Sequence, residues 1–267
     1  MVLSGVIDRA TELGYDLTIH TDIARKAAPG ALRPGSSRWI NKVADAGAAG
    51  LVVLTLPTSV VDTHTALKRS FPVALIDPID DVPPEVLSVS ATNWQGGRQA
   101  TQHLLDLGHT RIGVVGGLAT SRPAVERIEG YRSALEGAGI AFNQGLVLHE
   151  NFHYQAGLAG VRYLLGLAKP PTAIFALSDL VALGVIDSCR RRGLRIPQDL
   201  SLIGFDDTPL ARSYVPALTT IRQPLEAMGS AAVTLLDNAR RLPGTDWPRF
   251  QLETRLMVRD STGYAPQ

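Results

Sequence analysis

Short, continuous apolar runs separated by stretches of helical periodicity constrain the fold of this chain more than any other feature of its sequence. The runs do not alternate with polar residues, which is typical of parallel strands that are covered on both faces. They predict strands at 17–19, 50–56, 73–77, 111–115, 146–150, 173–177 and 200–205. The helical stretches between them lie at 1–13, 36–46, 58–69, 95–107, 124–137, 154–168, 179–192 and 224–241. This alternation predicts an α/β fold built from doubly wound parallel sheets.

The length of 267 residues suits two lobes of about 100–150 residues each. No linker rich in Pro and Gly separates two halves, so we expect the chain to cross between the lobes more than once, near residues 91, 222 and 250. The predicted N-terminal lobe comprises 1–91 and 223–250, and the C-terminal lobe comprises 92–222 and 251–267. The sequence opens on an amphipathic helix, whereas a doubly wound lobe normally opens on a strand. We therefore expect the first strand of the N-terminal lobe to be missing from this sequence.

Composition argues against several classes of protein. The net charge of +1, from 26 basic and 25 acidic residues, requires no nucleic acid or membrane surface as a partner. Cys189 is the only cysteine, so no intrachain disulfide can form, which fits a reducing compartment. No apolar run reaches the roughly 20 residues that span a bilayer, and the N-terminal segment lacks the order of an export signal. We expect a cytoplasmic protein with no membrane partner.

Polar side chains cluster just after the predicted strands, where open α/β sheets bind their ligands. The candidates are Asp77, Arg122, Arg127, Phe152, Ser178, Asp179, Asp206 and Asp207. A carboxylate accepts hydrogen bonds from sugar hydroxyls, a guanidinium donates a planar fork, and an aromatic ring packs on an apolar sugar face. Asp206 and Arg127 would also neutralise each other on burial. The pattern predicts a site for a small polar ligand such as a sugar.

Each candidate also has a structural interpretation. The alternatives are a turn cap for Asp206 and Asp207, a helix N-cap for Ser178 or Asp179, a solvated helix arginine for Arg127, a core ring for Phe152 and a backbone amide partner for Asp77. No single residue decides between the two interpretations. Their shared position at strand ends favours a binding site.

Several long motifs, in the right order, resemble those of the LacI/GalR family. They are LGHTRIGVVGG at 107–117, ERIEGYRSALEGAGI at 126–140, PTAIFALSDLVALG at 171–184, GLRIPQDLSLIGFDD at 193–207 and PALTTIRQ at 216–223. The resemblance is strong over about 90–260 and weak over 1–89. It implies two doubly wound parallel-sheet lobes with multiple chain crossovers, of the periplasmic-binding-protein-like type I. It also implies the effector-binding and dimerisation core of a transcriptional regulator or repressor, with the effector in the inter-lobe cleft.

The resemblance implies roles for individual residues. Arg127 and Asp206 match effector-binding positions, Phe152 matches a ring that stacks on the ligand, and Asp77 matches a polar pocket position. The remaining implied ligand-binding positions are Ser121 and Arg122 in a loop that varies with the ligand, Gln223 near an inter-lobe crossing, and Ser178, where sugar-binding members often carry Asn.

The resemblance also implies partners: a small-molecule effector, a second copy in a homodimer, and operator DNA. Family members contact DNA through an N-terminal helix-turn-helix domain that has no counterpart in this sequence, so the chain alone is not expected to read DNA. We expect no cofactor, no metal and no catalytic residue. The six His residues show no metal-ligand spacing, and the G-x-G-x-x-G, P-loop and G-x-S-x-G motifs of enzymes do not occur. The alternatives are a periplasmic sugar-binding protein of a transport system, which an export signal in the full gene would favour, and an α/β enzyme.

Overall fold

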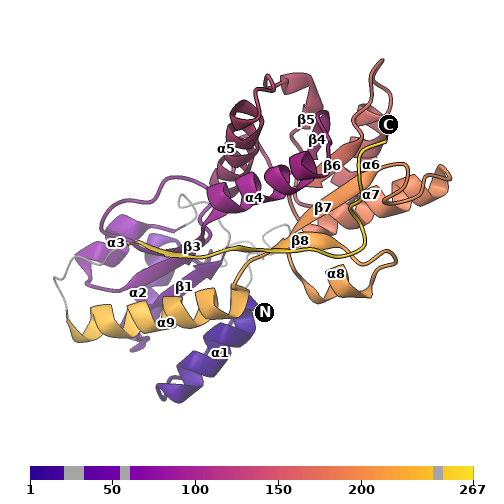
Figure 1. Cartoon of the computed structure of the whole chain (residues 1–267). Coiled ribbons are helices and arrows are strands. Elements are labelled where there is room, and N and C mark those ends of the chain that lie inside the picture. Colours follow the sequence, from indigo (N-terminus) through magenta and orange to yellow (C-terminus); the bar gives the residue numbers. More distant parts are fainter. Residues whose placement is uncertain (21–32, 55–60, 243–248, 267) are drawn as a thin grey trace. The chain divides into compact units, whose positions relative to one another are not determined.

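The computed structural model describes residues 1–20, 33–54, 61–242 and 249–266, which fall into two compact units (Figure 1). The smaller unit comprises Met1–Ala91 and Pro224–Leu252, and the larger unit comprises Thr92–Gln223 and Glu253–Gln267. The chain thus crosses between the units after residues 91, 223 and 252, whereas the sequence analysis places the last two crossings near 222 and 250.

The smaller unit is a four-stranded parallel sheet in the order β1-β2-β3-β9, with helices on both faces. Its strands are β1 Leu51–Leu54, β2 Val73–Ile76, β3 Leu87–Ala91 and β9 Phe250–Leu252, and its helices are α1 Val2–Glu12, α2 Ser37–Asp45, α3 Thr63–Lys68 and α9 Leu225–Arg241. Successive side chains of a strand point to opposite faces. In β2, Ala74 and Ile76 therefore join one apolar cluster with α1 and α9, while Val73 and Leu75 join another with α2 and α3.

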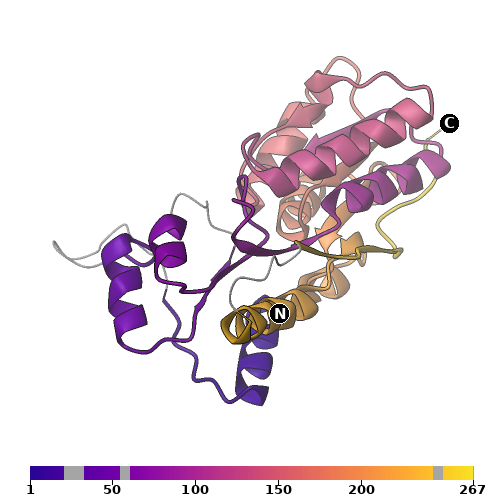
Figure 2. The ribbon, with the colours of Figure 1, turned by 90° about the vertical axis from the view of Figure 1, so that its left-hand side faces the viewer.

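The larger unit is a six-stranded sheet in the order β10-β8-β7-β6-β4-β5, in which only β10 runs antiparallel to its neighbour. Its strands are β4 Ile112–Val115, β5 Val147–Leu148, β6 Ala173–Ala176, β7 Ser201–Asp206, β8 Thr219–Arg222 and β10 Arg255–Met257. Its helices are α4 Asn93–Asp106, α5 Arg122–Gly137, α6 Tyr154–Leu164, α7 Asp179–Arg191, the short α8 Pro209–Ser213 and a 3-10 turn at Gln144–Leu146. Helices α4 and α5 cover one face and α6 and α7 the other, as Figure 2 shows from the side.

Neighbouring helices cross with their backbones in contact, and paired glycines make this possible. A Cβ on Gly97 of α4 would lie 2.1 Å from the carbonyl oxygen of Arg127, and one on Gly130 of α5 would lie 2.1 Å from that of Trp94. Gly157 and Gly184 allow the same close backbone approach between α6 and α7, as do Gly5 and Gly229 between α1 and α9. The α4–α5 crossing therefore fixes the position of Arg127 on α5.

The predicted α/β fold with parallel-sheet lobes is confirmed, and most of the predicted elements lie where the sequence places them. The strand predicted at 17–19 is wrong. Within the described part of the chain, these residues join no sheet, and Leu17 and Ile19 remain 42% and 58% exposed. Apolar character alone does not make a strand where no neighbouring strand supplies ladder hydrogen bonds.

Other differences concern boundaries and missed elements. The predicted strand at 50–56 and helix at 58–69 extend partly outside the described residues; α3 begins at Thr63 because the Asp62 carboxylate caps it, accepting the Thr65 N–H at 2.9 Å. The predicted helix at 154–168 ends at Leu164. Strands β3, β8, β9 and β10 and helix α8 are not among the sequence predictions.

Candidate functional site

The carboxyl ends of the parallel strands in the larger unit gather the polar residues that the sequence singles out. Strands β4, β6, β7 and β8 run parallel and in register, so all four end at one edge of the sheet. Ser178 follows β6, Asp206 is the last residue of β7, and Gln223 follows β8. Helix α5, which carries Arg127, comes after β4. This edge is where a doubly wound sheet binds ligands.

Arg127 lies at the centre of this edge and is 4% exposed. Its Nε donates to Asn93 Oδ1 at 2.8 Å, and its Nη1 donates to the carbonyl oxygen of Leu177 at 2.6 Å. The guanidinium lies 3.7 Å from the ring centroid of Phe205 and 5.6 Å from that of Phe152. Hydrogen bonds and ring faces thus offset the cost of burying the cation. The alternative of a solvated helix arginine is wrong.

Asp206 faces Arg127 across a gap of 3.9 Å between Oδ1 and Nη1. The same Oδ1 accepts a hydrogen bond of 2.6 Å from Gln223 Nε2. The Asp206 side chain is 21% exposed, so it can also accept hydrogen bonds from a bound molecule. Gln223 is buried, and its Oε1 has no hydrogen-bond partner among the described residues.

The Phe152 ring is half-buried next to the loop that follows β4. Gly117 in this loop has φ +70°, and a Cβ there would lie 3.2 Å from Phe152 Cζ and 2.3 Å from the Cβ of Ala124. A bare backbone at Gly117 therefore leaves room for the ring beside the cation of Arg127.

Ser178 begins helix α7 as its N-cap, with its Oγ accepting the Val181 N–H at 3.2 Å. The capping alternative for this residue is therefore confirmed, and its side chain is buried. A ligand contact of Ser178 stays a prediction.

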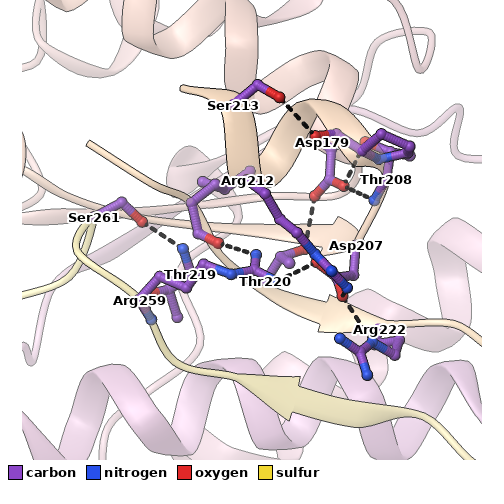
Figure 3. Close-up of polar contacts among 12 residues, drawn as sticks. Asp179, Asp207, Thr208, Arg212, Ser213, Thr219, Thr220, Arg222, Arg259 and Ser261 are labelled. Carbon is purple, nitrogen blue, oxygen red and sulfur yellow. Dashed lines mark hydrogen bonds and ion pairs between the residues drawn. The ribbon is translucent and has the colours of Figure 1, made fainter. Parts of the chain in front are cut away.

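Asp179 is fully buried and accepts three hydrogen bonds: from the Thr208 N–H at 2.6 Å, the Thr208 hydroxyl at 2.9 Å and the Thr220 hydroxyl at 2.6 Å (Figure 3). Burial raises the pKa of Asp179 to about 6, although the hydrogen bonds from Thr220 and Thr208 oppose this shift.

Asp207 is an ion-pair partner rather than a simple turn cap. Its carboxylate is fully buried and pairs with Arg259, with Arg222 at 2.7 Å and with Arg212 at 3.4 Å. Burial raises the pKa of Asp207, but the hydrogen bonds and charges of Arg259 and Arg222 outweigh this effect and hold the pKa below its ordinary value.

The remaining candidates make other contacts. Ser121 is the buried N-cap residue of α5, and Arg122 pairs with Glu126 on the same helix at 2.9 Å. Asp77 belongs to the smaller unit, where its Oδ1 accepts the Ala91 N–H at 3.4 Å, as its structural alternative predicts.

The structure thus brings four of the eight predicted ligand-binding residues into one group around Arg127 and Asp206: these two, Phe152 and Gln223. Sequence reasoning missed Asn93 and Phe205, which hold the Arg127 guanidinium in place. Both carry a positional signal, since Asn93 follows β3 by two residues and Phe205 directly precedes Asp206. Among the described residues, no group of His, Cys, Asp and Glu could hold a metal ion, and no helix combines the length and apolar character needed to cross a membrane.

The sequence matches known proteins over most of its length. A family model for a periplasmic binding protein-like domain matches residues 101–262. The regulator DegA of Bacillus subtilis is 32% identical over 260 residues, which cover 96% of this chain and 74% of DegA. The chain belongs to the LacI family of transcriptional regulators.

Two further comparisons extend this result. The regulator CelR of Thermobifida fusca is 41% identical over 181 residues, covering 67% of this chain and 53% of CelR, so the match spans about half the length of that relative. The solved complex of CelR with cellobiose superposes with a TM-score of 0.85 at 31% identity, over 97% of this chain and 77% of that one. A LacI family regulator from Enterococcus faecium with bound ribose superposes with a TM-score of 0.84 at 27% identity, over 98% of this chain and 92% of that one. These relatives are regulators, which disfavours both the transport protein and the enzyme.

Proposed function

We propose that this LacI family member is an effector-binding core that senses a sugar at the carboxyl edge of its larger unit. The observation that carries the proposal is the grouping of a buried cation, a partly exposed carboxylate and a half-buried ring, in Arg127, Asp206 and Phe152. The carboxylate would accept hydrogen bonds from adjacent hydroxyls, and the ring would pack on the apolar face of a pyranose or furanose. Two similar solved structures contain cellobiose and ribose, which supports a sugar rather than another polar molecule.

The chemistry of the group suits binding rather than turnover. Arginine stays protonated at every physiological pH, so Arg127 cannot act as a general base. The carboxylate of Asp206 is occupied by Gln223 Nε2 on one oxygen and lies opposite the Arg127 cation. Such a pair orients a ligand by hydrogen bonds and leaves it unchanged. Chromatography of the sugar recovered from the bound fraction would check this point, and we expect the sugar to be unchanged.

Signalling follows from differential binding. A sugar can shift the protein between two conformations only if it binds one of them more tightly. In this proposal the ligand-bound core alters operator binding by a regulator that also carries a DNA-binding domain. Assembly as a homodimer and a contribution of Asp77, Ser121, Arg122 and Ser178 to the ligand contacts belong to the proposal as well.

The test is ligand binding by calorimetry and thermal shift, with cellobiose, ribose, glucose, a polyol and a nucleobase as probes. A ligand that binds only the folded state raises the melting temperature with its occupancy. We expect a sugar to bind, and we expect Arg127→Ala and Asp206→Asn each to weaken its affinity at least tenfold. Arg132→Ala is the matched control, because Arg132 lies on the same helix, is exposed, and contacts Glu136 at 3.0 Å and the Phe142 ring at 5.0 Å from its centroid.

Two results would count against the proposal. Unchanged sugar affinity in both Arg127→Ala and Asp206→Asn would sink the site. Binding of the nucleobase and of none of the sugars would refute the sugar as ligand class. The same two variants would then test the site with the nucleobase as the ligand.

A further inference from the structure

Asp206, the proposed ligand acceptor, has an uncommon backbone conformation. Its φ is +114°, and φ of the next residue, Asp207, is +54°. Residues other than glycine rarely adopt positive φ, and such strain persists only where the surrounding structure over-determines it. Two consecutive strained residues at the end of β7 therefore require something that holds them.

The first anchor is the Asp207 carboxylate. It is fully buried and receives Arg212 from α8, Arg222 from β8 and Arg259 from the segment after β10 (Figure 3). Hydrogen bonds between guanidinium and carboxylate groups are among the strong ones in proteins. Three separate elements thus fix residue 207 from different directions.

The second anchor is Asp179, the first residue of α7. Its Oδ2 accepts both the N–H and the hydroxyl of Thr208, at 2.6 and 2.9 Å, and its Oδ1 accepts the hydroxyl of Thr220 at 2.6 Å. A Cβ on Gly204 would lie 2.7 Å from this Oδ1, so a bare backbone in β7 gives the carboxylate its space. Residue 208 is therefore tied to the start of α7 and to β8 together.

These anchors bracket Asp206 between a strand and two fixed residues. On one side it is the last residue of β7, and its carbonyl oxygen accepts the Gln223 N–H at 3.2 Å. On the other side residues 207 and 208 are held by buried carboxylates. With both sides fixed, the strained conformation directs the Asp206 side chain to Gln223 Nε2 and toward Arg127.

We propose that Asp207 and Asp179 are positioning residues, whose buried carboxylates hold residues 207 and 208 and thereby force Asp206 to present its carboxylate to a ligand. The ligand-binding half of this inference rests on the proposed function. A purely structural role for the same ion pairs predicts something different: loss of an anchor would lower stability and leave the conformation of Asp206 and the affinity of the folded protein unchanged.

The test variant is Asp207→Asn. Asparagine tolerates positive φ as well as aspartate does and has nearly the same shape, so the substitution keeps the backbone preference while it removes the charge and one of the two acceptor oxygens that the three arginines share. The matched control is Asp199→Asn, which removes a carboxylate that accepts hydrogen bonds from the Arg195 side chain at 2.8 and 2.9 Å in the same unit.

The first readout needs no ligand. In Asp207→Asn we expect hydrogen exchange of the Thr208 amide to accelerate at least tenfold, and φ of Asp206 in a crystal structure of the variant to leave the positive region. Asp199→Asn should change neither. Unchanged exchange together with an unchanged φ in Asp207→Asn would overturn the inference. Should Asp207→Asn fail to fold, Arg222→Gln removes one of the three arginines and should give the same changes at smaller size.

The second readout is the affinity of the folded variants for cellobiose and ribose. We expect at least a tenfold loss in Asp207→Asn and none in Asp199→Asn. Gly157→Ala, which disturbs the α6–α7 crossing, serves as a destabilised variant in which affinity should stay at the wild-type value. Equal losses of affinity in Gly157→Ala and Asp207→Asn would mean that stability alone is responsible. If the wild-type protein binds neither cellobiose nor ribose, the ligand-free readout alone decides the positioning role, and the ligand class is decided by the probes of the proposed function.

Discussion

Gly97→Ala should displace Arg127 even though residue 97 lies on a different helix. The new Cβ would lie 2.1 Å from the carbonyl oxygen of Arg127 and 2.8 Å from its Cα, whereas ordinary contacts begin at 3.4 Å. Both neighbouring atoms belong to the backbone, so no side chain can rotate away. The α4–α5 crossing must therefore open by about 1.3 Å, the difference between 3.4 and 2.1 Å. An opening of this size would carry the 2.6 Å hydrogen bond between Arg127 Nη1 and the Leu177 carbonyl beyond 3.5 Å.

The expected cost combines three effects. Overpacking costs about 1–3 kcal/mol. Weakening the charged hydrogen bonds of the buried guanidinium adds about 1.5–3 kcal/mol. Alanine recovers up to about 1 kcal/mol because it favours the helix over glycine. We expect the free energy of unfolding of the larger unit to fall by about 1.5–6 kcal/mol, measured by urea denaturation with circular dichroism.

Gly137→Ala is the control, because Gly137 ends the neighbouring helix α5 and a Cβ there meets nothing within 4 Å. Only the helix preference remains, so this variant should match the wild type or gain up to about 1 kcal/mol. A Gly97→Ala protein as stable as Gly137→Ala would refute the argument that the glycine pair sets the position of Arg127.

Three further predictions concern titratable and buried groups. Burial raises the pKa of Asp179 from 3.8 to about 6, so the protonated carboxyl stabilises the fold fully below pH 4 and this contribution is lost as the pH rises through 6. In urea unfolding, the wild-type protein should therefore lose up to about 3 kcal/mol of stability between pH 4 and pH 7. Asp179→Asn should not show this loss. Tyr131→Phe should cost about 1 kcal/mol in the same assay, because the buried hydroxyl donates to the Ile112 carbonyl at 2.9 Å, while Tyr163→Phe, at an exposed site, should cost almost nothing. Burial raises the pKa of the Cys189 thiol to about 11, so a thiol reagent at neutral pH should label it only as the protein unfolds; rapid labelling of the native protein would contradict this.

The strands that the sequence predicts are those whose buried faces are made of apolar residues. Strands β2, β4 and β6 are fully buried apolar runs, and simple hydrophobicity finds them. The sequence does not predict strand β8, because its buried residues Thr219 and Thr220 are polar and satisfy their hydroxyl groups by hydrogen bonds. Thr219 Oγ1 accepts the Arg259 N–H, and the Thr220 hydroxyl donates to Asp179. Polar residues whose partners lie about 40 positions away look like loop residues until those partners are known.

In the candidate site, the residues proposed to face the ligand are easier to predict from the sequence than the residues that support them. Arg127 and Asp206 follow from strand-end position and from the motifs that the LacI family shares. The residues that hold Arg127, Asn93 and Phe205, act through the direction of an amide and the face of a ring, which depend on how α4 and β7 meet α5. Sequence spacing does not encode those directions.

The neighbouring residues Asp206 and Asp207 show why local sequence leaves such roles open. Both are aspartates at the end of the same strand, yet the Asp206 side chain is 21% exposed and the Asp207 side chain is fully buried among arginines. Their φ values of +114° and +54° break the alternation of an extended strand and send the two carboxylates to different partners. Those φ values depend in turn on distant groups, Asp179 and the three arginines. In the proposed site, the choice of which aspartate faces the ligand is therefore a property of the whole carboxyl edge, and a homologue with the same two aspartates but without these partners should present its carboxylate differently.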